Sequence, residues 1–263
     1  MPPLHPQRMK LTPYALLLFC LTAALLAVGC SNRNNSPQYS DGKEITQLLD
    51  SLFTRLEETY SSTNSDTERL VVINEKIRRA IEHIDSPKLL DDILSGYDTK
   101  KHDFSFILSP DTKICVFSWY THMENSGNRI KNIALYHSND KMIPTSLYGT
   151  PVIYGEINQI ETYDGETIYL LQGNDSIYQN RFYRLNAYLL KNGYLEETPA
   201  FPNNESSIAI NSLLDSSKMG PPSHFKIEMN GLRILFHDQL DTSNVENILA
   251  FDGKKYVPEK EHR

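Results

Sequence analysis

The chain has 263 residues, of which 40% are hydrophobic and 10% aromatic. This is enough apolar material for one large folded domain or two small ones. The 33 acidic residues outnumber the 26 basic ones, and the net charge is −7. Such acidity argues against nucleic acid as a partner, because contacts to phosphate need clustered Lys and Arg.

Residues 1–29 are predicted to be a signal peptide. Arg8 and Lys10 supply positive charge, an apolar stretch follows at 15–28, and small residues precede Cys30. A stretch this short is typical of a secretory signal, whereas a membrane-spanning helix needs about 20 apolar residues. Removal of 1–29 takes away two basic residues and no acidic one, so the remaining chain has a net charge of −9.

Cys30 follows the run Leu25-Leu26-Ala27-Val28-Gly29. Together they resemble the lipobox of bacterial lipoproteins. The resemblance implies that a diacylglyceryl group is attached to the Cys30 thiol and that the chain is then cleaved before this residue. Cys30 is therefore the expected lipidation site, and two or more acyl chains, such as palmitate, would anchor the protein stably in a membrane. An uncut signal anchor or a simple secreted protein is the alternative.

The chain beyond Cys30 resembles the envelope lipoproteins of Gram-negative bacteria in its general organisation. That similarity implies a location in the bacterial cell envelope. The residue after Cys30 is Ser31 rather than Asp, which favours the outer membrane over the inner one. Residues 30–41 are polar and include Pro37, so we expect a flexible tether between the lipid and the folded part.

The segment 42–96 is predicted to be helical. Apolar residues recur there at spacings of three and four, which places them on one face of an amphipathic helix. The first predicted helix carries Ile45, Leu48, Leu49, Leu52, Phe53, Leu56 and Tyr60 on that face, and the second carries Leu70, Ile73, Ile77, Ile81 and Ile84. We expect these two helices to pack as a hairpin.

Capping signals mark where the helices begin. Asp41 with Glu44 resembles a capping box, and Ser65 with Glu68 has the S-x-x-E spacing of another. A short third helix is predicted between Pro87 and Gly96, since Pro is favoured at the first position and Gly at the end. Its inward residues are expected to be Leu90, Ile93 and Leu94.

The segment 100–258 is predicted to be a mainly antiparallel β-domain, which makes the chain α+β. Apolar residues alternate with polar ones there, and Ser109–Lys113 has the composition of a turn. Four dipeptides give strong hairpin signals: Asp164-Gly165, Asn192-Gly193, Asn230-Gly231 and Asp252-Gly253. A sandwich, a barrel or a propeller-like arrangement would suit about ten short strands. The segment 202–222 is expected to be a long loop, with a short strand or a helical turn at 208–214.

Chemistry-bearing residues form no recognisable catalytic motif. The histidines lack metal-ligand spacing, no serine lies in a nucleophile elbow, and no glycine-rich phosphate loop is present. Cys115 is the one thiol left after Cys20 and Cys30, and its apolar neighbours predict a buried strand residue. We therefore expect neither a cofactor nor a metal, and no catalytic residue is assigned.

Tyrosine gives the functional hint. The chain has 15 Tyr and one Trp, and several tyrosines lie beside Asn and Gln between 148 and 188. Rigid aromatic rings next to adaptable amides can bind sugars and peptides. We therefore expect a non-catalytic protein that binds a protein or glycan partner through Tyr154, Tyr163, Tyr169 and Tyr178, although alternating Tyr is also typical of ordinary sheet surface. The alternative function is an envelope hydrolase whose site is assembled from separated strands.

Overall fold

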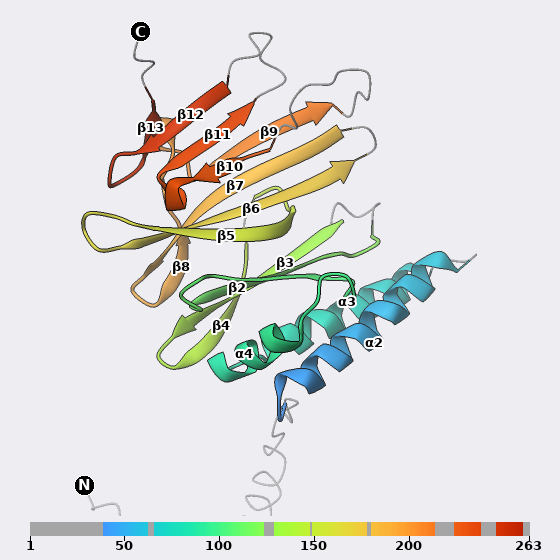
Figure 1. Ribbon diagram of the computed structural model, residues 1–263. Helices are drawn as coiled ribbons and strands as arrows, with labels where there is room; N and C mark the ends of the chain where they lie inside the picture. The colour runs from blue at the N-terminus through green and yellow to red at the C-terminus, as the bar shows by residue number, and fades with distance from the viewer. Residues whose placement is uncertain are drawn as a thin grey trace, which may run out of the picture. The chain divides into compact units, whose positions relative to one another are not determined.

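The computed structural model describes residues 39–62, 66–123, 129–147, 149–177, 180–213, 224–237 and 246–259. The described elements belong to one compact unit, which begins at Tyr39. Three helices precede thirteen strands in this part of the chain, and all strand pairs are antiparallel. The predicted α+β class is therefore confirmed (Figure 1).

The helices are α2 (Gly42–Ser61), α3 (Thr67–Glu82) and α4 (Pro87–Gly96). Asp41 caps α2 as predicted, because its side chain accepts the backbone N–H of Glu44 at 2.9 Å. The prediction for α3 was displaced by one residue: Asp66, and not Ser65, is the N-cap, and its carboxylate accepts the N–H of Arg69 at 3.1 Å. Asp is as good an N-cap residue as Ser, so the S-x-x-E spacing alone did not decide the start.

The apolar faces of α2 and α3 are buried almost as predicted, except that Leu48 and Tyr60 are exposed. In α4 the prediction was wrong at one position, since Leu94 is 49% exposed and Leu89 is buried in its place. Leu89 lies four residues before Ile93 and therefore shares its face. Ile93 packs close to α2, where a Cβ at Gly42 would lie 2.5 Å from the Ile93 nitrogen.

The first sheet has the order β1-β2-β3-β4, and both of its faces are buried. Its helix-facing side chains, among them Cys115, Phe117 and Trp119, share one core with the three helices. Ile114, Val116 and Ala134 point to the opposite face and pack against the second sheet. Its strands are β1 (Ser105–Leu108), β2 (Ile114–Tyr120), β3 (Ile130–Ser138) and β4 (Lys141–Ser146).

The second sheet has the order β5-β6-β7-β8, with β9 also paired to β7, and the third sheet has the order β10-β11-β12-β13. A third hydrophobic cluster joins these two sheets. The strands are β5 (Ile153–Glu161), β6 (Thr167–Ile177), β7 (Asn180–Lys191), β8 (Tyr194–Glu197), β9 (Ser207–Leu213), β10 (Lys226–Glu228), β11 (Arg233–His237), β12 (Glu246–Phe251) and β13 (Tyr256–Pro258).

All four predicted dipeptide turns join neighbouring antiparallel strands. At Asn192-Gly193 both residues have positive φ, 52° and 80°, which is the conformation that a tight hairpin requires. Three strands were missed by the sequence analysis: β4, β8 and β13. Strand β9 forms where a short strand or a helical turn was expected at 208–214, and residues 214–222 lie outside the described part.

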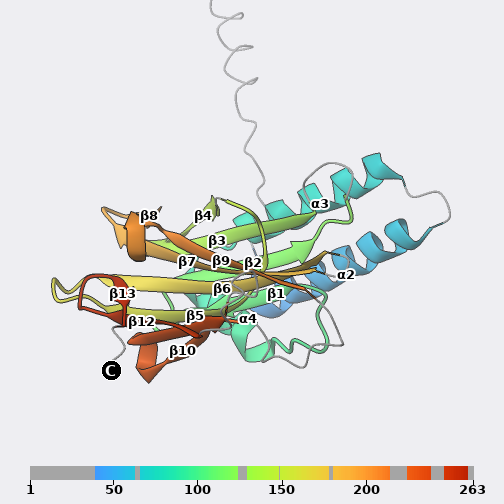
Figure 2. The same cartoon turned by 90° about the horizontal axis from the view of Figure 1, so that it is seen from above.

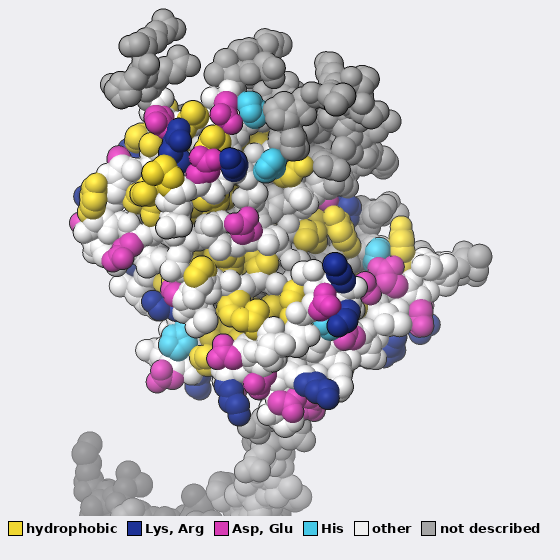
Figure 3. Space-filling model, viewed as in Figure 1, with side chains coloured by type: hydrophobic (Ala, Val, Ile, Leu, Met, Phe, Trp, Pro, Cys, Tyr) yellow, Lys and Arg dark blue, Asp and Glu magenta, His cyan; other side chains and the backbone are white. Residues whose placement is uncertain are grey.

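The elements are layered from the helices outward. Figure 1 shows α2 and α3 beside the green strands of the first sheet, followed by the yellow and orange strands of the second sheet and the red strands of the third. From above, α2 and α3 lie next to each other along one flank (Figure 2). On the face in Figure 3, the basic side chains that are drawn alternate with acidic ones instead of gathering in a patch.

Candidate functional site

The structure does not bring the four predicted tyrosines together. Tyr154 and Tyr169 are buried between the first and second sheets. The Tyr154 hydroxyl donates to Asn186 Oδ1 at 3.1 Å, and the Tyr169 hydroxyl donates to Asp111 Oδ2 at 2.7 Å. Tyr169 thus joins the second sheet to the turn between β1 and β2, and neither ring is available to a partner in the native fold.

Tyr163 differs from these two because it is 81% exposed. It lies at the β5–β6 turn, and its ring packs against Gly253 in the β12–β13 turn, where any larger residue would collide with it. Its N–H also donates to the Gly253 carbonyl at 2.8 Å. Tyr178 and Cys30 lie outside the described residues.

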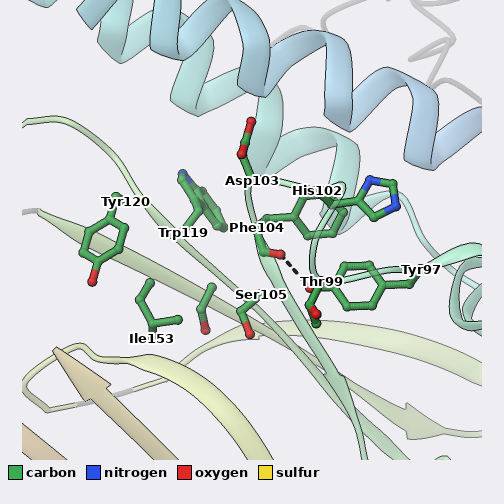
Figure 4. Close-up of a pocket in the computed structure, with 10 residues that line it drawn as sticks. Tyr97, Thr99, His102, Asp103, Phe104, Ser105, Trp119, Tyr120 and Ile153 are labelled. Atoms are coloured by element: carbon green, nitrogen blue, oxygen red, sulfur yellow. Dashed lines mark hydrogen bonds between the residues drawn. The ribbon is translucent and has the colours of Figure 1, made fainter.

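A different group of aromatic residues surrounds a pocket of about 240 Å³ at the edge of the first sheet. We call it the Tyr120 pocket. Tyr120 and Ile153 lie on one side, Tyr97 and Thr99 on the other, and Ser105 between them (Figure 4). The complete lining is Tyr97, Thr99, His102, Asp103, Phe104, Ser105, Ser118, Trp119, Tyr120 and Ile153.

Backbone contacts fix the shape of this pocket. The Tyr97 hydroxyl donates to the Phe104 carbonyl at 2.7 Å and accepts the Phe106 N–H at 3.1 Å. This phenol therefore holds the segment between α4 and β1 in place. Ser105 Oγ donates to the carbonyl of Tyr154, and Ser118 Oγ accepts the Tyr154 N–H at 3.3 Å. These two serines attach the start of β5 to the edge of the first sheet.

A histidine–carboxylate pair lies behind the pocket. His102 Nδ1 donates to Asp50 Oδ1 on α2 at 2.7 Å, and the imidazole stacks on Tyr97 with ring centroids 5.3 Å apart. In Figure 4 the His102 ring and the Asp103 carboxylate both point away from Ser105. Burial is the main cause that raises the pKa of Tyr97, although the hydrogen bond from the Phe106 N–H lowers it, so its phenol stays neutral. The groups that face the pocket around Ser105 are therefore uncharged, and the Asp103 carboxylate of the lining points away from them.

A second pair repeats this arrangement two turns farther along α2. His122 Nε2 lies 2.5 Å from Glu57 Oε1, and its ring stacks on Tyr60 at 4.2 Å. His122 also has a positive φ of 58°, which is unusual for a residue with a side chain. Because Asp50 and Glu57 are seven residues apart on one helix face, the two pairs hold α2 against the loops that flank the first sheet.

Trp119 separates the Tyr120 pocket from a second one. Its indole N–H donates to Asn74 Oδ1 at 2.8 Å, and the Asn74 amide donates to the carbonyls of Leu70 and Thr121. The second pocket, of about 310 Å³, lies between α3 and the ends of β2 and β3, and it includes Val71, Met123 and Lys131. The single Trp of the chain thus forms part of the wall of both pockets.

The described residues include no group of three His, Cys, Asp or Glu side chains that could hold a metal. The Asp50–His102 pair has the orientation of a general base, with Nε2 left free, but Nε2 is buried and no described hydroxyl bonds to it. A serine hydrolase needs its hydroxyl at that nitrogen.

Cys115 is fully buried and faces the helices, as predicted from its neighbours. Burial raises the pKa of its thiol, so the reactive thiolate is scarce at neutral pH. We expect a thiol reagent such as dithionitrobenzoate to modify Cys115 only after denaturation. Rapid modification of the native chain would show that this thiol is accessible and would reopen the hydrolase alternative.

Sequence reasoning missed the Tyr120 pocket because its residues come from three distant segments: 97–105, 118–120 and 153. The alternation of Phe104, Phe106 and Leu108 did predict strand β1, but it gave no sign that this edge meets β5. The unusual Tyr content directed attention to Tyr154 and Tyr169, which the structure buries, and not to Tyr97 and Tyr120.

Comparison with protein-family models found no matching family, and neither a curated protein nor a solved structure matches the chain. None of the helices in the described part is long and apolar enough to cross a bilayer.

Proposed function

We propose that this chain is a lipid-anchored protein of the bacterial cell envelope, at the outer membrane, and that it binds a partner without chemical turnover. The Tyr120 pocket supports this proposal, because it combines exposed aromatic surface with uncharged hydroxyl groups and lacks converging acid and base groups. Tyr120 is 39% exposed, and a partly exposed aromatic at a concave site is a common anchor of an interface.

The size of the pocket favours part of a large partner over a whole small ligand. Small-molecule sites generally measure about 300–1,000 Å³, and the Tyr120 pocket measures about 240 Å³. A side chain of a protein or one unit of a glycan would suit that volume. We further propose that α2 and α3 form a helical hairpin and that the first and second sheets form a sandwich, which presents this pocket at its edge.

The anchor is tested at Cys30. Its thiol is the proposed point of lipid attachment, so Cys30→Ala should leave the chain uncleaved or release it from the membrane fraction. Incorporation of labelled palmitate should fall to background in the variant. Labelling of Cys30→Ala at the level of the unaltered protein would contradict the assignment.

Binding is tested by capture of the lipidated protein from its own envelope. Tyr120→Ala should reduce recovery of the partner by about tenfold or more, as expected when an interface anchor is removed. Tyr194→Ala is the matched control, since Tyr194 is 63% exposed but lies on β8, outside the pocket. Equal recovery with both variants would exclude the Tyr120 pocket as the contact site.

A further inference from the structure

We infer that the Tyr120 pocket accepts one ring of a neutral saccharide. This inference rests on the proposed binding function and specifies its ligand. The pocket offers three partly or fully exposed hydroxyl residues, Thr99, Ser105 and Tyr120. The Thr99 and Tyr120 hydroxyls can donate or accept a hydrogen bond, and Ser105 Oγ, which donates to the Tyr154 carbonyl, can still accept one. A sugar ring has hydroxyls around its rim, so it matches this set of groups.

The aromatic residues provide the second part of the match. Tyr97 and Tyr120 lie on opposite sides of the pocket in Figure 4, and each remains partly accessible. A pyranose ring has an apolar C–H face, which an aromatic ring can cover. The Tyr120 hydroxyl can also bond to the sugar rim, whereas the Tyr97 hydroxyl is already bonded to the backbone of Phe104 and Phe106. The aromatic rings on two sides can therefore cover the face of a sugar, and the hydroxyls between them can bond to its rim.

Charge argues against an anionic ligand. The lining of the Tyr120 pocket has no Lys or Arg, and His102, the one basic residue in it, is bound to Asp50 and points away from Ser105. The chain beyond residue 29 also has a net charge of −9. The Arg129 guanidinium near Tyr120 is already paired with the Asp175 carboxylate. A phosphate, a sulfate or a uronic acid would therefore find no unpaired counter-charge among the lining residues and would be repelled by the protein as a whole.

A cationic ligand is disfavoured for a different reason. The guanidinium of Arg129 already lies over the Tyr120 ring, 5.3 Å from its centroid, and Arg129 is also paired with the buried carboxylate of Asp175. An ammonium group bound to Tyr120 would share the ring with that cation. The Asp103 carboxylate, which could offset its charge, points away from Ser105.

Trp119 allows a direct test, because it is the single Trp and contributes to the pocket wall. The full chain is kept in a detergent without a sugar headgroup and titrated with cellotriose, maltotriose and chitotriose to millimolar concentration. We expect at least one of them to change the Trp119 emission in a saturable manner. The apparent Kd should rise about tenfold or more in Tyr120→Ala and severalfold in Thr99→Val, which removes an exposed hydroxyl at nearly constant volume.

Val71→Ala is the control, since Val71 lines the second pocket beside Trp119 and not the Tyr120 pocket. Its Kd should stay within about twofold of the unaltered chain. The saccharide assignment is overturned if no sugar gives a saturable change, if Tyr120→Ala binds equally well, or if choline or a lysine-rich peptide replaces the sugars as the ligand. Capture that still depends on Tyr120 while all sugars fail would leave the binding function standing and assign a protein partner instead.

Discussion

Alkaline pH is expected to unfold this protein steeply. The phenols of Tyr154, Tyr169, Tyr188 and Tyr256 are all buried, and burial is the main cause that raises their pKa values. In the unfolded chain a tyrosine titrates near pH 10. Above that pH the unfolded state therefore releases protons that the native state retains.

The sign follows from proton linkage. A phenol with a raised native pKa contributes its full stability below the unfolded pKa and loses it as the pH rises toward the native pKa. Each such group lowers the free energy of unfolding by up to about 1.4 kcal/mol per pH unit. Four of them together lower it by up to about 5.5 kcal/mol per pH unit above pH 10. A domain stabilised by about 5–15 kcal/mol should therefore unfold between about pH 11 and 13.

Urea midpoints measured between pH 7 and pH 11, together with phenolate absorbance at 295 nm, test this expectation. Absorbance from the buried tyrosines should appear only with unfolding. Tyr188→Phe removes one of the four ionisable groups but keeps its ring. The free energy of unfolding should therefore fall less steeply with pH, by the slope that corresponds to about one proton. Full titration of all tyrosines in a chain that remains folded would contradict the burial described for these side chains.

Replacement of Trp119 should strongly destabilise the fold. The indole is buried in the core shared by the helices and the first sheet, where it contacts Phe53 edge-on at 6.3 Å. Loss of a buried Trp generally costs about 3–5 kcal/mol. Asn74 Oδ1 would also lose its donor, and an unsatisfied buried acceptor costs about 1–3 kcal/mol more.

We therefore expect Trp119→Ala to lower the Tm by about 10 °C or more, measured by circular dichroism because the fluorophore is lost. Trp119→Phe keeps most of the ring and should have an intermediate effect. Tyr194→Ala removes an exposed ring, and its free energy of unfolding should change by no more than about 0.5 kcal/mol. A Trp119→Ala chain as stable as Tyr194→Ala would refute the packing between α3 and β2.

Local patterns predicted most of the fold because they reflect local physical causes. The apolar spacing from Ile45 to Leu56 predicts a helix with one buried face, and this segment forms α2. The Asn-Gly and Asp-Gly pairs require positive φ, and the hairpins form there. Where the sequence analysis failed or left alternatives open, tertiary contacts decided: Leu89 rather than Leu94 of α4 is buried, and β9 (Ser207–Leu213) forms as a strand because it pairs with β7.

The candidate site was harder to predict from the sequence, because tertiary contacts decide which tyrosines are exposed. Tyr154 and Tyr169 have the strand spacing of surface tyrosines, but both faces of the second sheet are covered by other sheets, so these rings became core residues. Whether a strand face is covered depends on the stacking of whole sheets, which alternation within one strand does not encode. Tyr120 stays exposed because it ends β2, at the rim of the first sheet.

Site-specific photo-crosslinking in the native envelope tests the central claim most directly. A benzophenone amino acid is placed at position 120 in one chain and at position 194 in another, and both chains keep Cys30. Binding through the Tyr120 pocket predicts a discrete crosslinked product from position 120, which is absent from position 194 and severalfold weaker when Thr99→Val is added. Products of equal yield from both positions, or none from position 120, would contradict the account.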